Sequence, residues 1–288
     1  MKAEKKSLIP GLHWTGDGHV SLSGRLLDRA RTVEALLRDW AIGMGAAEYR
    51  FPEMIAARHL TPIAYVKSFP HLATFVTSAA RDDAAQASLA AECGDAPRIP
   101  LIDGRFEPIE QLLAPAACYH FYHRLAGESL EVPLLLTTEC RCHRRESHYL
   151  PLRRQWSFSM RELVCFGDRA AVERFTGNCR RDIEAFAHRL GLDAAWHAAS
   201  DPFFDPAADP KALAQLVEPA KQELKLADGL AIASINDHRG FFGECYGIRY
   251  GKRTARSACV AFGIERWLAA LIERYGHDTA AWPEPATG

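Results

Sequence analysis

The sequence predicts an α+β fold with a mainly antiparallel sheet flanked by helices, because the apolar periodicity changes along the chain. Mostly helical periodicity marks the first third, whereas short β-type runs gather after residue 130. A polar loop joins two of these runs into one long hairpin, and helices separate others. No internal repeat or clear linker divides the chain. We therefore expect a single domain over residues 23–288 that follows a loose lead-in over 1–22.

Helices are the main elements expected before residue 130. The first covers 23–40, where apolar residues recur at steps of three and four, and it ends at Gly43 and Gly45. An alanine-rich helix is expected over 71–91, with Gly94 after it. The remaining segments are helical turns over 53–59 and 110–113 and short extended pieces over 47–51 and 63–66.

Strands prevail after residue 130. The hairpin pairs a strand over 131–138 with one over 155–166, across a loop over 139–154 that is rich in Arg and His. Amphipathic helices are expected over 169–190, 211–226 and 263–275, the first of them closed by Gly191. The other strands are expected over 196–200, 229–235, 244–250 and 259–262.

The composition is that of a globular protein. The 288 residues are 48% hydrophobic and 25% charged, which does not fit a disordered chain. The net charge of -1 disfavours a dedicated nucleic-acid binder, although it allows a local basic patch. We expect no membrane span, because no apolar run reaches about 18 residues. The N-terminus lacks the apolar core of a secretory signal, so we expect a cytoplasmic protein with eight reduced cysteines.

Six arginines gather on or beside the hairpin: Arg141, Arg144, Arg145, Arg153, Arg154 and Arg161. One guanidinium group can bind two phosphate oxygens at once, and it keeps its positive charge. The cluster therefore suits a polyphosphate. A solvated basic loop is the alternative. Glu139 and Glu146 lie among the arginines, which favours a binding role. Trp156 and Phe158 share one face of the returning strand, where either ring could stack on a base.

Two further patterns have open interpretations. The segment 257–267 runs from a strand through Gly263 into a helix, so Arg266 could turn back toward the sheet and meet an anion or a planar ring, or pair with a local acid. Cys140-x-Cys142-His143 is the obvious local metal candidate. Adjacent strand residues point to opposite faces, however, and no nearby CxxC or HxxxH completes a tetrahedral site.

These segments resemble motifs of class II aminoacyl-tRNA synthetases: CHRRE (142–146) and LRRQWSFSMRE (152–162) resemble motif 2, and AFGIERW (261–267) resembles motif 3. The chain more closely resembles the amino acid:[carrier protein] ligases, which are similar to the core of the atypical zinc-dependent seryl-tRNA synthetases of methanogens. The segments that carry this likeness are SFPHL (68–72), ACYHFY (117–122), SMRELV (159–164), SDPFF (200–204), SINDHRGFFG (234–243) and SACVAFGIER (257–266). The resemblance implies a class II synthetase-like core.

The resemblance also implies a catalytic zinc ion held by Cys118, Glu162 and Cys259, a set too widely spaced for local motifs to reveal. Two thiolates and one carboxylate leave a fourth position open, as catalytic zinc requires. The amino group of a small amino acid could fill it. Glu162 and Phe158 share a strand face, so the ion and the nucleotide could share a cleft. Three buried residues without a metal are the alternative.

The remaining site roles are implied in the same way. Arg144 and Arg266 are the expected catalytic residues, which neutralise the charge of the phosphates. The other ATP-binding residues are Glu146, which accepts a hydrogen bond from the adenine amino group, Arg154, which lies near the terminal phosphates, and Phe158, which sandwiches the adenine with Arg266. Substrate binding is expected from Glu162, Asp201 and Asn236, with His238 as a weaker candidate. Mg²⁺ is expected with ATP, but its ligand has no clear match, Glu244 being one possibility.

The implied function is ATP-dependent activation of a small amino acid, glycine or alanine, to an aminoacyl adenylate. Transfer to the phosphopantetheine thiol of a small acidic carrier protein follows. We expect a homodimer through residues 50–70, carrier docking on the helix over 211–226, and no tRNA or membrane partner. The alternatives are a tRNA-charging synthetase-like fragment and a catalytically silent regulatory paralogue.

Overall fold

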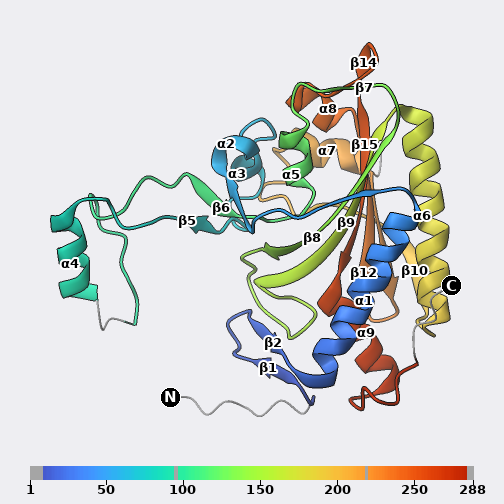
Figure 1. The fold of residues 1–288 in the computed structure, drawn as a ribbon, viewed down its shortest axis with the longest axis horizontal. Helices are drawn as coiled ribbons and strands as arrows, with labels where there is room; N and C mark the ends of the chain where they lie inside the picture. The colour runs from blue at the N-terminus through green and yellow to red at the C-terminus, as the bar shows by residue number, and fades with distance from the viewer. Residues whose placement is uncertain (1–8, 94–96, 218–219, 284–288) are drawn as a thin grey trace.

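A curved seven-stranded sheet organises the computed structural model, which describes residues 9–93, 97–217 and 220–283 (Figure 1). Its strands are β3 (Ala47–Tyr49), β8 (Leu134–His143), β9 (Ser157–Gly167), β10 (Ala194–Ala199), β11 (Lys221–Leu226), β12 (Ala231–Arg239) and β15 (Arg256–Gly263). They lie in the order β10-β11-β12-β15-β9-β8-β3. Only β3 runs parallel to its neighbour, β8, and all other pairs are antiparallel. The α+β class with a mainly antiparallel sheet is therefore confirmed.

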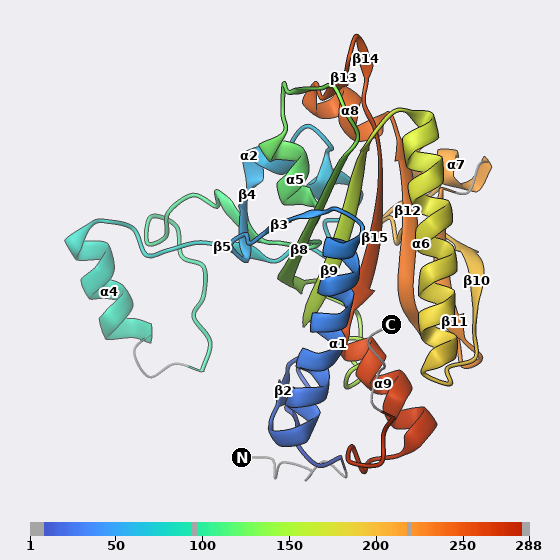
Figure 2. The ribbon, with the colours of Figure 1, turned by 45° about the vertical axis from the view of Figure 1, so that its right-hand side comes forward.

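Three long helices cover one face of the sheet. They are α1 (Gly24–Gly43), α6 (Arg169–Arg189) and α9 (Ile264–Tyr275), as Figure 2 shows. Their apolar stripes bury a continuous core in which Trp267 and Leu268 of α9 are fully buried. All three helices confirm the periodicity of the sequence, and Gly191 follows α6 with a left-handed φ of 64° that favours glycine.

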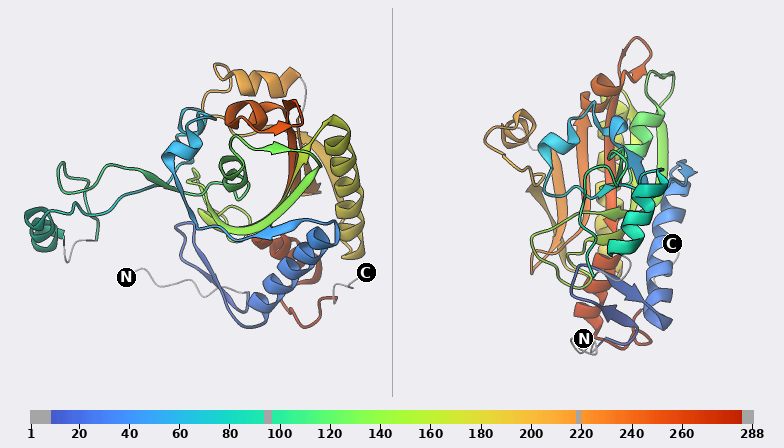
Figure 3. Two further views of the ribbon diagram at one scale, coloured as in Figure 1. Left: turned by 45° about the horizontal axis from the view of Figure 1, so that its top comes forward. Right: turned by 90° about the vertical axis from the view of Figure 1, so that its left-hand side faces the viewer.

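The other face is concave and curves around α5 (Tyr119–Arg124), as Figure 3 shows. Three more short helices lie on this side: α2 (Ala57–Leu60), α3 (Tyr65–Ser68) and α8 (Phe241–Tyr246). Successive residues of β9 point alternately into two apolar cores, one on each face of the sheet. Val164 and Phe166 pack on the concave side, whereas Leu163 and Cys165 pack under the long helices. Glu162 therefore points to the concave side, where the site lies.

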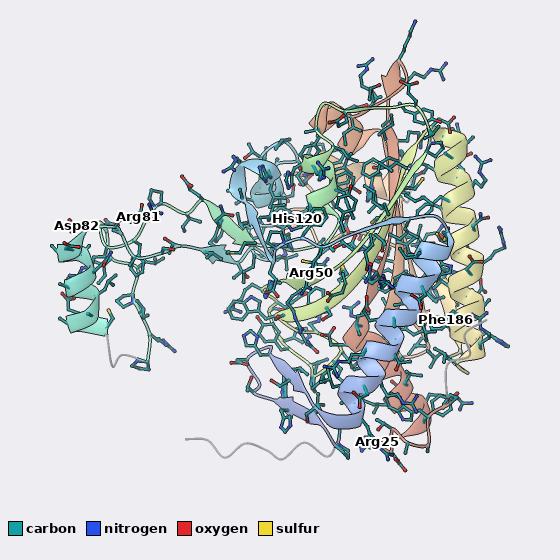
Figure 4. The ribbon with its side chains drawn as sticks, in the orientation of Figure 1. Arg25, Arg50, Arg81, Asp82, His120 and Phe186 are labelled. Atoms are coloured by element: carbon teal, nitrogen blue, oxygen red, sulfur yellow. The ribbon has the colours of Figure 1, made fainter. Side chains whose placement is uncertain are left out.

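A projecting arm leaves the body from a small three-stranded sheet of β4 (Met54–Ala56), β6 (Gln111–Leu113) and β5 (Phe75–Val76). The arm carries α4 (Asp83–Cys93) far from the main sheet (Figures 1 and 3). Arg81 and Asp82, labelled in Figure 4, lie at the start of this distant helix. The expected helix over 71–91 is thus confirmed only in its second half, and Gly94 lies outside the described residues.

Several short elements differ from the expectation because tertiary contacts override weak local preference. The helical turn expected over 110–113 is wrong, since β6 pairs there with β4. The turn expected over 53–59 is confirmed only at its end, where α2 covers 57–60. The extended piece expected over 63–66 instead leads into α3, after Ala64 adopts a left-handed conformation. The strand expected over 244–250 begins in α8 and is a strand only at its end. There β13 (Arg249–Tyr250) pairs with β7 (Ser129–Leu130) and β14 (Arg253–Thr254).

Two longer expectations also change. The helix expected over 211–226 is α7 (Pro210–Val217) followed by β11, because the alternation of Lys-Gln-Glu-Leu-Lys-Leu fits a strand between β10 and β12 with Leu224 buried. Residues 139–143, expected in the loop, extend β8. The lead-in is not loose over 12–22, where β1 (Leu12–Trp14) and β2 (Val20–Leu22) form a hairpin that buries Leu12 in the core beside α1.

Within the described ranges, no helix combines the length and the apolar composition that crossing a bilayer requires. Of the eight cysteines, which are free thiols, seven are buried and Cys245 is half-buried.

We predict that Leu163→Ala destabilises the protein by about 2–5 kcal/mol, because Leu163 is fully buried between the sheet and the long helices. The matched control is Leu101→Ala, since Leu101 is 73% exposed on the arm and should cost no more than about 0.5 kcal/mol. Urea unfolding of the full chain measures both. Equal losses for the two variants would contradict the assigned core.

Candidate active site

One large cavity of about 530 Å³ opens on the concave side of the sheet. Its walls come from β9, β12 and β15, from the loop of the β8–β9 hairpin, and from the segments that precede α5 and α8. The volume is in the range of small-molecule sites. The cavity brings together all the predicted site residues: Cys118, Arg144, Glu146, Arg154, Phe158, Glu162, Asp201, Asn236, Cys259 and Arg266.

Cys118, Glu162 and Cys259 converge at one wall of this cavity. Their ligand atoms all lie within 4.8 Å of one another, and among the described residues they are the only His, Cys, Asp or Glu group of three that could hold a metal ion. Glu162 on β9 faces Ala261, and Cys259 lies two residues before Ala261 on β15, so strand register makes the two ligands diagonal neighbours. Cys118 is the residue that directly precedes α5.

The three side chains, which we call the Cys–Glu–Cys triad, have the chemistry of a cation site. Oε1 of Glu162 accepts a hydrogen bond of 2.9 Å from the Ala117 amide, but Oε2 is buried without a partner. Burial, together with the charge of Cys259, raises the pKa of Glu162 to about 8. A hydrogen bond from the Cys118 thiol lowers the pKa of Cys259 well below its usual value. A divalent cation would balance the buried charge and pair the orphan oxygen, so the triad fits zinc.

Arg144, Phe158 and Arg266 line the cavity as a second group. Arg144 donates to the Pro115 carbonyl at 2.8 Å, and its guanidinium carbon lies 5.4 Å from the centre of the Phe158 ring. Arg266 turns back from the first turn of α9 toward the sheet, as the sequence suggested. Its guanidinium donates to the carbonyls of Arg153 (3.0 Å) and Ala231 (3.1 Å). Two cations and one exposed ring face suit a planar anionic ligand.

Phe158 rather than Trp156 supplies this ring. The indole of Trp156 donates to the Thr74 hydroxyl at 2.8 Å and stacks on His19 and under Arg145, outside the cavity.

Three predicted binding residues have partners within the cavity wall. Arg154 donates to Glu146 at 2.8 Å across the hairpin loop. Asp201 pairs with Lys221 at 2.9 Å, so its charge is balanced before any ligand arrives. Glu223 lies 3.4 Å from the same lysine.

The six-arginine cluster divides into two groups. Arg144, Arg153 and Arg154 line the cavity. Arg141 pairs with the buried Glu265, Arg161 pairs with Glu34 and Glu48, and Arg145 packs over Trp156. Half of the cluster therefore has a structural role.

The local cysteine cluster does not form a comparable site. Cys140 and Cys142 are buried together on the concave side, and their thiols donate to backbone carbonyls. His143 points the other way, where Nε2 meets the Ser157 hydroxyl at 3.2 Å. These three residues form no three-ligand group in the part of the chain that the structure describes.

Lys211, Lys221 and Glu223 also line the cavity, although the sequence analysis assigned them no role in the site. The reason is the helix expected over 211–226. Charged residues recur at every second position, at Lys221, Glu223 and Lys225. This spacing is the signal that could have predicted a strand with a charged face at residues 221–225. Lys211 projects inward and donates to the Ile63 carbonyl at 3.0 Å.

Comparisons with known proteins agree with this architecture. Residues 109–275 match the family model "tRNA synthetase class II core domain (G, H, P, S and T)". The chain is 33% identical over 250 residues to amino acid–[acyl-carrier-protein] ligase 1 of Bradyrhizobium diazoefficiens, which covers 83% of this chain and 74% of that protein. It is 24% identical over 288 residues to the type-2 serine–tRNA ligase of Methanococcus aeolicus, covering 94% of this chain and 55% of that protein.

Solved structures show the same fold. The M. kandleri SerRS in complex with A. aeolicus tRNASec superposes with a TM-score of 0.77 at 20% identity, covering 95% of this chain and 56% of that one. Prolyl-tRNA synthetase from Cryptosporidium parvum gives a TM-score of 0.70 at 12% identity, covering 96% and 52% of the two chains. The chain thus spans about half the length of these synthetases.

We predict that the purified protein contains about one equivalent of zinc, which Cys118→Ala and Cys259→Ala each abolish, because each removes one of only three protein ligands. Cys142→Ala is the matched control, since Cys142 is an equally buried thiol outside the triad. Elemental analysis by mass spectrometry measures the metal. Zinc that persists in both triad variants but is lost in Cys142→Ala would reject the assignment.

Proposed function

Because the chain belongs to the family of the class II tRNA synthetase core domain, we propose that it activates a small amino acid with ATP and transfers it to a carrier protein. The observation that carries the proposal is the sharing of one cavity by the Cys–Glu–Cys triad and the Arg144–Phe158–Arg266 group. The first suits an amino group and the second a nucleotide. The relatives named as amino acid–[acyl-carrier-protein] ligases support this assignment.

The first half-reaction forms an aminoacyl adenylate. A carboxylate oxygen of the amino acid attacks the α-phosphorus of ATP, the bond from that phosphorus to the bridging oxygen breaks, and pyrophosphate leaves. No protein nucleophile takes part. Arg144 and Arg266 neutralise the charge on the phosphoryl oxygens, so catalysis is positioning together with electrostatic stabilisation.

The adenine would lie between Phe158 and Arg266, with its amino group donating to Glu146. Arg154, which pairs with Glu146, extends the positive wall toward the terminal phosphates. Mg²⁺ would enter bound to ATP, since most ligands of this ion are phosphate oxygens and water molecules. Glu223 and Glu244 are carboxylates of the cavity wall that lie outside the triad and the adenine subsite.

Cys118, Glu162 and Cys259 would hold zinc through two thiolates and one carboxylate. The bound ion would supply a Lewis-acid position for the neutral α-amino group. Asn236 and the Asp201–Lys221 pair line the cavity around the substrate. We propose glycine or alanine as the substrate, and pyrophosphate exchange with each amino acid tests this choice.

The second half-reaction forms a carbon–sulfur bond. The phosphopantetheine thiolate of the carrier protein attacks the carbonyl carbon of the mixed anhydride, the carbon–oxygen bond to the phosphate breaks, and AMP leaves. We propose a small acidic carrier that docks on α7, the helical part of the segment 211–226 named above. We also propose a homodimer through residues 50–70, where Met54 and Val66 are 46% and 39% exposed, and sedimentation velocity tests it.

We predict ATP–pyrophosphate exchange that depends on glycine or alanine when zinc is present. Arg144→Ala should lower the exchange rate by about 10²–10³-fold, because it removes a cation that faces the phosphates. Arg145→Ala is the control, since the neighbouring Arg145 packs on Trp156 outside the cavity. Absence of exchange with every standard amino acid would favour the catalytically silent protein.

Transfer of the labelled amino acid separates the remaining alternatives. We expect label on a holo carrier protein and none on the apo carrier, because only the holo form has the acceptor thiol. The label should be released by hydroxylamine, as a thioester is. Label on tRNA alone would reject carrier loading and favour the tRNA-charging alternative, for which the type-2 serine–tRNA ligases are the relevant relatives.

A further inference from the structure

The two cysteines of the triad have different surroundings. Cys259 faces two side-chain nitrogens from the neighbouring strand: Nδ2 of Asn236 at 3.4 Å and Nε2 of His238 at 3.6 Å from its sulfur. Strand register explains the contacts, since Asn236 is the direct partner of Cys259 on β12 and His238 lies two residues further along. Cys118, in contrast, faces the other two triad members, whose ligand atoms lie within 4.8 Å of its sulfur.

The ring of His238 is held from its other side. Its Nδ1 lies 3.0 Å from the hydroxyl of Tyr122 and 3.3 Å from the hydroxyl of Ser257. Tyr122 is fully buried, so its hydroxyl needs this hydrogen-bond partner. A phenol that donates to Nδ1 leaves the imidazole proton on Nε2. Nε2–H then points at the sulfur of Cys259.

Aromatic packing limits the movement of this pair. Phe242 stacks on Tyr122 with ring centres 3.6 Å apart and an interplanar angle of 4°. The same Phe242 ring lies perpendicular to His238, at 4.7 Å and 89°. The imidazole therefore has a defined plane.

We propose that His238 is a positioning residue of the metal site, which donates Nε2–H to the Cys259 thiolate under the control of Tyr122 and Ser257. The proposal rests on the metal site of the proposed function. Two thiolates and one carboxylate bring three negative charges to an ion of charge two, and hydrogen bonds to the sulfur disperse the excess. Such outer hydrogen bonds also orient the ligand.

The consequence is an unequal pair of thiolates. Asn236 and His238 fix the direction of the Cys259 sulfur, and hence the side from which it would bind the ion. The nucleotide group of Arg144, Phe158 and Arg266 has no hydrogen bond with His238 among the described contacts. Loss of His238 should thus weaken metal and amino acid binding and leave ATP binding unchanged.

The test measures zinc affinity of the full chain by competition with a chromophoric chelator. We expect His238→Ala to weaken zinc binding by about 10- to 100-fold, the usual effect of losing an outer-shell partner. Tyr122→Phe keeps the ring stack but removes the hydroxyl, so it should shift the affinity in the same direction by a smaller factor. His197→Ala on the edge strand β10 is the control and should leave the affinity unchanged.

Further readouts separate positioning from a general structural effect. In the cobalt-substituted protein, His238→Ala should shift the thiolate-to-metal charge-transfer band. The KM for the amino acid should rise while the KM for ATP stays constant. Zinc affinity in His238→Ala equal to that of the wild type would overturn the positioning role alone. An imidazole nitrogen in the zinc X-ray absorption spectrum of the wild type would also overturn it, because His238 would then be a ligand.

Failure of the proposed function gives a different result. If the wild type bound no zinc, or if Cys118→Ala and Cys259→Ala kept it, the metal site itself would be rejected, together with the role of His238. If zinc bound tightly and depended on His238 but no pyrophosphate exchange occurred, the positioning role would stand and the catalytic function would be rejected.

Discussion

The antiparallel pairing of β9 with β15 is the constraint on which the site depends. It places Glu162 and Cys259 on the concave side as diagonal neighbours, and it sends Leu163 and Val260 into the core under the long helices. A shift of β9 by one residue in this register would turn Glu162 into that apolar core, while Cys259 on β15 stayed on the concave side. The buried residues of both faces therefore stabilise the same register that assembles the triad.

Acidic and basic side chains line the same cavity in two separate groups. The Cys–Glu–Cys triad consists of acidic groups that can bind a cation, whereas Arg144, Arg154 and Arg266 are cationic. Each group is held by protein contacts of its own: the Ala117 amide orients Glu162, and backbone carbonyls orient Arg144 and Arg266. Such fixed charges need little rearrangement when a reaction develops charge, which is the physical basis of electrostatic catalysis.

Residues that look equivalent in the sequence have different roles in the structure, because their contacts around the cavity differ. Arg144 faces the cavity while the adjacent Arg145 packs on Trp156, and Arg161, on β9, is buried against Glu34 and Glu48. Cys142 and Cys259 are both buried thiols, yet only Cys259 meets two further ligands. In each pair the residue type is the same, and the sequence around it does not show which residue belongs to the site and which has a structural role.

The amino-acid sequence by itself determined the long elements: the helices α1, α6 and α9 and the β8–β9 hairpin follow from an apolar period sustained over many residues. The family resemblance added the triad, whose members are 44 and 97 residues apart in the chain and share no local pattern. Tertiary structure alone decided the short elements. β4, β6 and β11 are strands because partners complete their hydrogen bonds. It also decided the contact of His238 with Cys259, since pairing between β12 and β15 is a long-range interaction that no local preference specifies.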